Sequence, residues 1–172
     1  MTSFRGIAAP ALAAMAISGA AQSAAADESG SFTALASLVT DYTMIERAGG
    51  TIVGGASAGT NTILESSGGP FAAGEHSHVT CVVYGKRSAA GLELEAPCTS
   101  TTAAGDKLYS ISKRSAGGVE EGAAGAGSLE LLGGTGKFAG VTGTCTYQTA
   151  YLAEGRVVTM SECNWQRSAG RQ

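Results

Sequence analysis

Ionisable and aromatic side chains that could do acid–base chemistry are scattered along short apolar segments of this 172-residue chain. A carboxyl or phenol group enclosed among apolar residues has a shifted pKa and can act as a general acid or base. Three such residues, Glu95, Tyr147 and Glu162, are candidates for catalysis. Five others are candidates for lining a ligand cavity: Tyr84, Tyr109, Arg114, Tyr151 and Trp165. The alternative is that all of these side chains are exterior and solvated.

His76 and His78 are the only histidines, and their spacing suggests half of a metal site. Alternate residues of a strand point to the same side, so the two imidazoles share one face. A catalytic zinc site needs three protein ligands, and no third ligand stands at a fixed spacing from this pair. We therefore expect no bound metal, and a solvated or cavity-edge pair instead.

The glycines and lysine of residues 133–137 do not form a nucleotide-binding loop. The Walker spacing would require a glycine at Leu131 and a serine or threonine at Phe138. We identify no Gly-x-Ser-x-Gly nucleophile elbow and no Ser, His and Asp order with supporting motifs, so nucleophilic catalysis is not expected. We expect no cofactor.

The elements that must position these side chains are short β-strands. Apolar runs rich in Val, Thr, Ile and Tyr alternate with frequent glycines, and few segments look helical. Strands are predicted over residues 32–38, 42–47, 51–53 continuing to 56–65, 76–84, 92–101, 107–114, 128–132, 141–152 and 156–165. Short turns join them, which predicts an all-β, antiparallel up-and-down barrel of about eight strands, closed so that no sheet edge is left.

One segment between predicted strands, Ser115–Gly127, is too long to be a tight turn. It is rich in glycine and alanine, and Val119 is its only apolar anchor. Long loops of this kind in compact domains are either mobile or functional lids, and we favour a mobile loop here.

All four cysteines lie after residue 80, and an even count in an exported chain implies disulfides. A three-residue hairpin loop at 153–155, with Gly155 in the left-handed conformation, places Cys145 opposite Cys163. A four-residue loop at 88–91 likewise places Cys81 opposite Cys98. The sequence therefore predicts two hairpin disulfides, Cys81–Cys98 and Cys145–Cys163.

The first 26 residues read as a secretory signal, followed by one domain over residues 27–172. Arg5 is their only charge, residues 7–17 are apolar or small, and Ala24-Ala25-Ala26 offers a cleavage site. The apolar run is too short and too rich in alanine to span a membrane. We expect an exported protein, periplasmic or extracellular.

Composition argues against two classes of partner. The net charge of −3 becomes −4 without Arg5, and no basic stripe is present, so nucleic acid is not an expected partner. Aromatic residues make up only 6% of the chain and form no visible girdle, which disfavours a barrel embedded in an outer membrane.

The most distinctive pattern is residues 129–143, Leu-Glu-Leu-Leu-Gly-Gly-Thr-Gly-Lys-Phe-Ala-Gly-Val-Thr-Gly. A leucine-rich strand enters a glycine-dense turn and leaves as another strand. This order resembles the hairpin of plant dirigent proteins and of allene oxide cyclase-like barrels. In dirigent proteins an arginine commonly follows the Phe of the motif, where this chain has Ala139.

The resemblance implies a calycin-like or allene oxide cyclase-like barrel, in a bacterial exported member of that group. Eight strands enclose room for side chains or one small ligand. The implied function is to bind or sterically direct a small apolar or aromatic molecule in the lumen. One alternative is a cyclase or isomerase that uses an interior Tyr or Glu, and another is a structural or interaction barrel with a filled core. A homo-oligomer is also possible, since such assemblies are common in the group.

Overall fold

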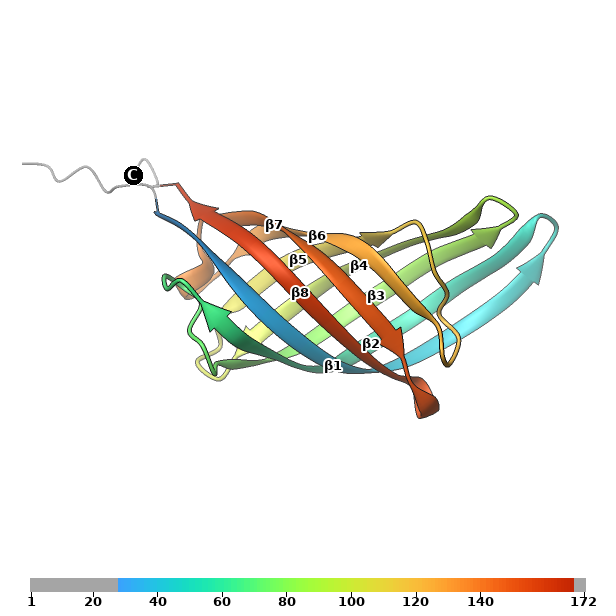
Figure 1. Ribbon diagram of the computed structural model, residues 1–172, viewed down its shortest axis with the longest axis horizontal. Helices are drawn as coiled ribbons and strands as arrows, with labels where there is room; N and C mark the ends of the chain where they lie inside the picture. Colours follow the sequence, from blue (N-terminus) through green and yellow to red (C-terminus); the bar gives the residue numbers. More distant parts are fainter. Residues whose placement is uncertain (1–27, 169–172) are drawn as a thin grey trace, which may run out of the picture.

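A closed barrel of eight antiparallel strands is formed by residues 28–168, the part of the chain that the computed structural model describes (Figure 1). Each strand pairs with the next along the chain, and β8 pairs with β1 to close the barrel. The strands are β1 (Glu28–Arg47), β2 (Gly50–Ser66), β3 (His76–Ser88), β4 (Gly91–Thr102), β5 (Lys107–Arg114), β6 (Ala124–Gly134), β7 (Val141–Tyr151) and β8 (Arg156–Arg167). The predicted fold is confirmed, while the secretory signal lies outside the described residues.

Several strands are longer than the sequence predicts, and β1 and β6 are the clearest cases. Residues 32–38 and 42–47 belong to one continuous strand, because Asp41 pairs with Ala56 of β2 and does not break β1. β6 begins at Ala124, four residues before the predicted start at residue 128, because Ala124–Gly127 pair with β7.

Side chains alternate between the two faces of the barrel wall. Along β3, Val79, Cys81 and Val83 are buried, and the residues between them are exposed. This period of two is the geometry of a strand whose inner face lines a core and whose outer face meets solvent. The barrel therefore presents every second residue of each strand to its lumen.

Four aromatic residues fill the end of the barrel where the described chain begins and ends. We call this cluster the aromatic plug: Phe32, Phe71, Phe138 and Trp165. Phe71, from the segment between β2 and β3, stacks on Phe32 with ring centroids 4.0 Å apart. Its ring also packs against Phe138 and Trp165, at 5.5 and 5.8 Å. Burying aromatic rings in such contacts stabilises the fold and seals this end.

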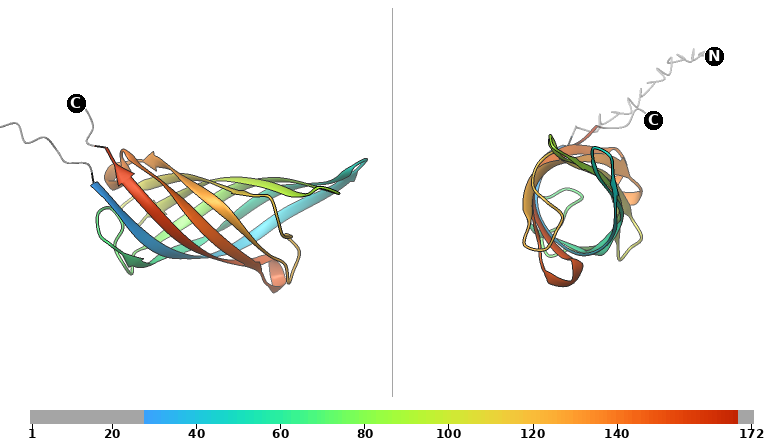
Figure 2. Two further views of the ribbon diagram at one scale, coloured as in Figure 1. Left: turned by 45° about the horizontal axis from the view of Figure 1, so that its top comes forward. Right: turned by 90° about the vertical axis from the view of Figure 1, so that its right-hand side faces the viewer.

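The β1–β2 and β3–β4 hairpins extend from the opposite end (Figure 2). β8 accompanies β1 only as far as Val39, so the last part of β1 pairs with β2 alone. The segment of residues 115–123, which joins β5 to β6, lies at this same end.

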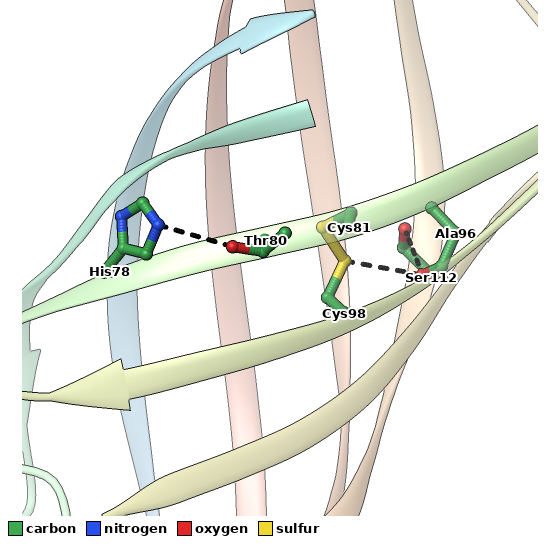
Figure 3. The surroundings of a disulfide bond; sticks show 6 residues. All are labelled: His78, Thr80, Cys81, Ala96, Cys98 and Ser112. Atoms are coloured by element: carbon green, nitrogen blue, oxygen red, sulfur yellow. Dashed lines mark hydrogen bonds between the residues drawn. A yellow bond between two sulfur atoms is a disulfide. The ribbon is translucent and has the colours of Figure 1, made fainter. Parts of the chain in front are cut away.

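Both predicted disulfides are present, Cys81–Cys98 and Cys145–Cys163. Each joins residues that face one another directly across a hairpin, with Cα atoms 4.1 and 4.0 Å apart. Figure 3 shows the first of them bridging β3 and β4. The loop at 153–155 has the predicted geometry, with Gly155 at φ of +69°. The other loop is shorter than the predicted four residues, because Ser88 pairs with Gly91 across a turn of residues 89 and 90, and the register of the cysteines is unchanged.

Candidate functional site

The barrel encloses a cavity of about 160 Å³ along its axis. It extends from Phe32 and Phe138 at the plugged end to Tyr42 and Arg114 near the hairpin end. An apolar cavity of about 150 Å³ is known to hold one benzene molecule, so the lumen has room for about one aromatic ring.

The lining combines apolar groups with many hydroxyls. Apolar side chains come from every part of the wall, among them Leu38, Ile63, Val79 and Leu131. Between them stand small hydroxyl residues, including Ser57, Ser100, Ser110, Thr149 and Thr159. Thr159 donates a hydrogen bond of 2.9 Å to Thr149, so part of this polarity is satisfied within the wall. Such a lining suits a ligand with both apolar and polar atoms.

Arg114, the last residue of β5, is the basic side chain of this lining and is only 4% exposed. Its Nη2 donates to the Gly118 carbonyl oxygen at 2.9 Å and to the Tyr151 hydroxyl at 3.2 Å. The guanidinium carbon also stands 5.4 Å from the centre of the Tyr151 ring. Nη1 has no hydrogen-bond partner, and no carboxylate in residues 28–168 forms an ion pair with Arg114.

Three tyrosines surround this guanidinium: Tyr42, Tyr147 and Tyr151. Burial, reinforced by Tyr151, raises the pKa of Tyr42 above its ordinary value. Burial also raises the pKa of Tyr147, although the charge of Arg114 opposes the shift. At neutral pH both groups are therefore neutral phenols, which can donate hydrogen bonds.

Two glycines of β6 make room for these side chains. A methyl group at Gly125 would overlap Nη1 and Cδ of Arg114, and one at Gly127 would overlap the Tyr147 phenol. The space inside Gly125 and Gly127 is thus filled by the side chains of Arg114 from β5 and Tyr147 from β7. The Tyr147 hydroxyl additionally donates to the Lys113 carbonyl oxygen at 3.4 Å.

The segment of residues 115–123 packs on the same end of the lumen. Val119 is buried against a cluster that includes Val53, Tyr151 and Val157. The backbone amides of Gly122 and Tyr151 donate to the carbonyls of Tyr151 and Ala123, respectively. These contacts hold the segment against the end of the lumen, where a lid would lie.

An ion pair joins that segment to β3. Glu120 accepts a hydrogen bond of 2.5 Å from Arg87, and its carboxylate also accepts from the Val119 amide. The Arg87 hydrogen bond is the main reason that the pKa of Glu120 falls to about 2. The carboxylate therefore stays ionised throughout the physiological range.

The structure separates the sequence-predicted site residues into three groups. Tyr147, Tyr151 and Arg114 line the cavity as expected. Four others are on the outer face and exposed, so their predicted interior positions are wrong: Tyr84, Glu95, Tyr109 and Glu162. Their strands place them outside because each lies one residue from an inward position. Trp165 is buried, but in the aromatic plug rather than in the cavity lining.

Sequence reasoning missed Tyr42, Gly125 and Gly127. Tyr42 would have been found by treating β1 as continuous, because it shares the even-numbered face of Phe32 and Leu38. The alternation of glycine with alanine over residues 124–127 was the signal for the two glycines.

His76 and His78 share one face, as expected, and it is the exposed outer face of β3. His76 is hydrogen-bonded to Thr62 at 2.9 Å and His78 to Thr80 at 3.3 Å. No cluster of three potential metal ligands occurs within residues 28–168. In the same range, no helix is long and apolar enough to cross a membrane.

Residues 55–59 read Gly-Ala-Ser-Ala-Gly and so match the Gly-x-Ser-x-Gly spacing of a nucleophile elbow, a match that the sequence-based interpretation overlooked. An elbow needs a sharp turn from a strand into a helix. Ser57 instead lies in the middle of β2, paired with Thr40 on one side and Cys81 on the other. The two histidines point to the outside, so they cannot serve Ser57 as a base.

Comparison with known proteins gives one informative match. No family model and no curated protein matches the chain. Among solved structures, the chain is similar to the pterocarpan synthase dirigent protein GePTS1, with 13% sequence identity and a TM-score of 0.51. The match covers 85% of this chain and 88% of that one. This chain therefore has a dirigent-like β-barrel fold.

Proposed function

We propose that the protein is an exported barrel that binds a small apolar or aromatic molecule in its lumen. The observation that carries this proposal is the cavity of about 160 Å³, lined by apolar side chains together with a buried Arg114 that has an unpartnered nitrogen. A barrel serving only as a structural unit would fill this space with side chains. The dirigent-like fold adds support, because a barrel of eight strands has room for one small ligand.

Export is part of the same proposal. The first 26 residues have the order of a secretory signal, and the four cysteines all form disulfides. Disulfides persist in oxidising compartments, which fits the periplasm or the extracellular space.

A cyclase or isomerase is the second candidate, and the tyrosine cluster favours it. Tyr42 and Tyr147 are neutral phenols beside a guanidinium, so either could protonate or hydrogen-bond an oxygen of a bound molecule. Their raised pKa values suit an acid better than a base. Glu95 and Glu162 have no part in this version, because both are on the outside.

The test is an NMR titration of the mature, oxidised protein with benzyl alcohol, a neutral single-ring probe. Binding in the lumen is expected to shift amide resonances of inward-facing residues on several strands. Ala36 lines the cavity and the neighbouring Ser37 is exposed, so Ala36→Phe should abolish binding and Ser37→Phe should preserve it. The proposal is overturned if no single-ring aromatic probe binds, or if benzyl alcohol binds the folded Ala36→Phe variant as well as the wild type.

A further inference from the structure

The buried guanidinium of Arg114 has no counter-charge within residues 28–168. Arginine stays protonated in proteins, so Arg114 cannot lose its charge on burial. An unpaired buried charge is costly, and the structure offers Arg114 only a carbonyl and a hydroxyl as hydrogen-bond partners. Nη1 is a hydrogen-bond donor that has no acceptor.

From this arrangement we infer that the lumen binds a small carboxylic acid with about one aromatic ring, and that Arg114 pairs with its carboxylate. The inference deepens the proposed function and rests on it. A carboxylate supplies the missing negative charge, and the hydrogen bonds that it accepts from a guanidinium are charge-assisted and among the strongest in proteins.

The charge of the lining favours a monoanion. Apart from Arg114, the lining contains one side chain that is charged at neutral pH, Glu75. Glu75 is already paired with Lys137, which comes from the turn between β6 and β7 at the plugged end. A single free positive charge matches a carboxylate, whereas a phosphate would bring about two negative charges at neutral pH.

The neutral phenols beside Arg114 fit the same ligand. Tyr42 and Tyr147 keep their protons, so neither supplies a phenolate to neutralise the guanidinium. Tyr42 can donate to a carboxylate oxygen instead, and Tyr147 can do so by exchanging its 3.4 Å hydrogen bond to the Lys113 carbonyl for one to the ligand. The rest of the cavity, with its apolar lining and its room for about one ring, is left for the body of the ligand.

The guanidinium also touches the segment that covers this end. Nη2 of Arg114 donates to the Gly118 carbonyl, so the ligand's carboxylate would bind to a group already connected to residues 115–123.

The experiment compares benzoate with benzamide, which share one ring and nearly one shape but differ in charge. Both are titrated into the mature, oxidised protein at neutral pH and low salt, with binding followed by NMR. We expect benzoate to bind about tenfold more tightly than benzamide, or better, in line with the strength of hydrogen bonds between charged groups. Equal binding by both probes would overturn the inference and leave the proposed function standing, because the neutral probe would still be bound.

Variants assign the preference to one side chain. Arg114→Met should abolish the preference for benzoate while benzamide still binds, and Arg114→Lys should retain part of it. Lys113→Met is the matched control, since Lys113 is the adjacent residue of β5 and its exposed side chain points outward. A loss of preference in Lys113→Met equal to that in Arg114→Met would refute a local site. The comparison of the two probes on wild-type protein needs no variant to fold, and failure of benzoate, benzamide and benzyl alcohol alike would overturn the proposed function together with this inference.

Discussion

The phenol of Tyr147 lies over Gly127, so close that a methyl group on Gly127 would come within 2.5 Å of the tyrosine hydroxyl oxygen. Gly125 has the same relationship to the guanidinium of Arg114. The two side chains that best define the candidate site thus occupy volume that β6 leaves empty. Residues without side chains help to specify this site.

Alanine at Gly125 or Gly127 should therefore destabilise the barrel and disturb the site. Neither glycine is in the left-handed region, so alanine fits the backbone and any effect is steric. Overpacking of this kind costs about 1–3 kcal/mol in the free energy of unfolding, measurable by urea denaturation. Gly54→Ala is the control, because no atom lies within 4 Å of a methyl group there. Equal stability of all three variants would show that the overlap is relieved at no cost.

The Arg87–Glu120 ion pair should make the segment of residues 115–123 sensitive to acid. The folded-state pKa of Glu120, about 2, lies below the ordinary value of 4.5, so the pair stabilises the fold above about pH 4.5. That contribution is lost as the pH falls from about 4.5 toward 2, and it is small because both side chains are well exposed.

Hydrogen exchange of the Val119 amide, corrected for the intrinsic rate, measures this effect. Glu120→Gln should accelerate the exchange at neutral pH, because the carboxylate that accepts from Val119 is gone. Glu121→Gln removes a charge from the neighbouring exposed residue and should leave the exchange unchanged. If both variants exchange at the same rate as the wild type, the ion pair does not hold the segment.

Titration of the buried phenols should destabilise the barrel in alkali. Burial raises the folded-state pKa of Tyr147 above its ordinary value of 10.0, so the unfolded chain loses this proton first. Stability is therefore complete below about pH 10 and declines as the pH rises above it. The measurement is a pH titration of the native protein followed by the near-ultraviolet absorbance of phenolate. The part of this signal that Tyr147→Phe removes belongs to Tyr147, and it should appear only above about pH 10. Its appearance at or below the ordinary value would contradict the burial argument.

Removal of the Cys81–Cys98 bridge by replacing both residues with alanine should cost about 2–5 kcal/mol of stability. The bridge closes a loop with a sequence separation of 17, which reduces the number of conformations open to the unfolded chain. Thr80 and Thr99 form the next directly opposed pair of the same hairpin, so Thr80→Ala with Thr99→Ala is the matched control. Urea denaturation of the two double variants should give a clearly smaller loss for the threonine pair. Equal losses would mean that packing, rather than the covalent link, accounts for the effect.

Local rules were enough to predict the barrel and its covalent links. The length of a hairpin loop fixes which residues face each other, and two separate loops each brought a pair of cysteines into register. The strand pattern predicted nine segments rather than eight strands, because residues 32–38 and 42–47 were separated although both belong to β1.

Local rules could not show which face of each strand points into the lumen. Around Tyr147 both faces carry polar and apolar residues, so alternation alone does not reveal which face is inside. Glu162 lies outside only because its neighbour Cys163 points into the lumen. Arg114 reverses the usual rule that charged side chains face water, so a pattern of polar and apolar residues does not reveal its inward position.

The placement of the two disulfides has a mechanical consequence. One bridge ties β3 to β4 and the other ties β7 to β8, so the seam between β8 and β1 is held only by non-covalent contacts. The start of β1 and the end of β8 lie side by side at that seam, where Glu28 pairs with Arg167 (Figure 1). A force that pulls these two ends apart would load the hydrogen bonds between the strands one after another, as in unzipping. Under load the barrel would open at this seam first, and the bridge at Cys163 would then carry the tension from β8 into β7.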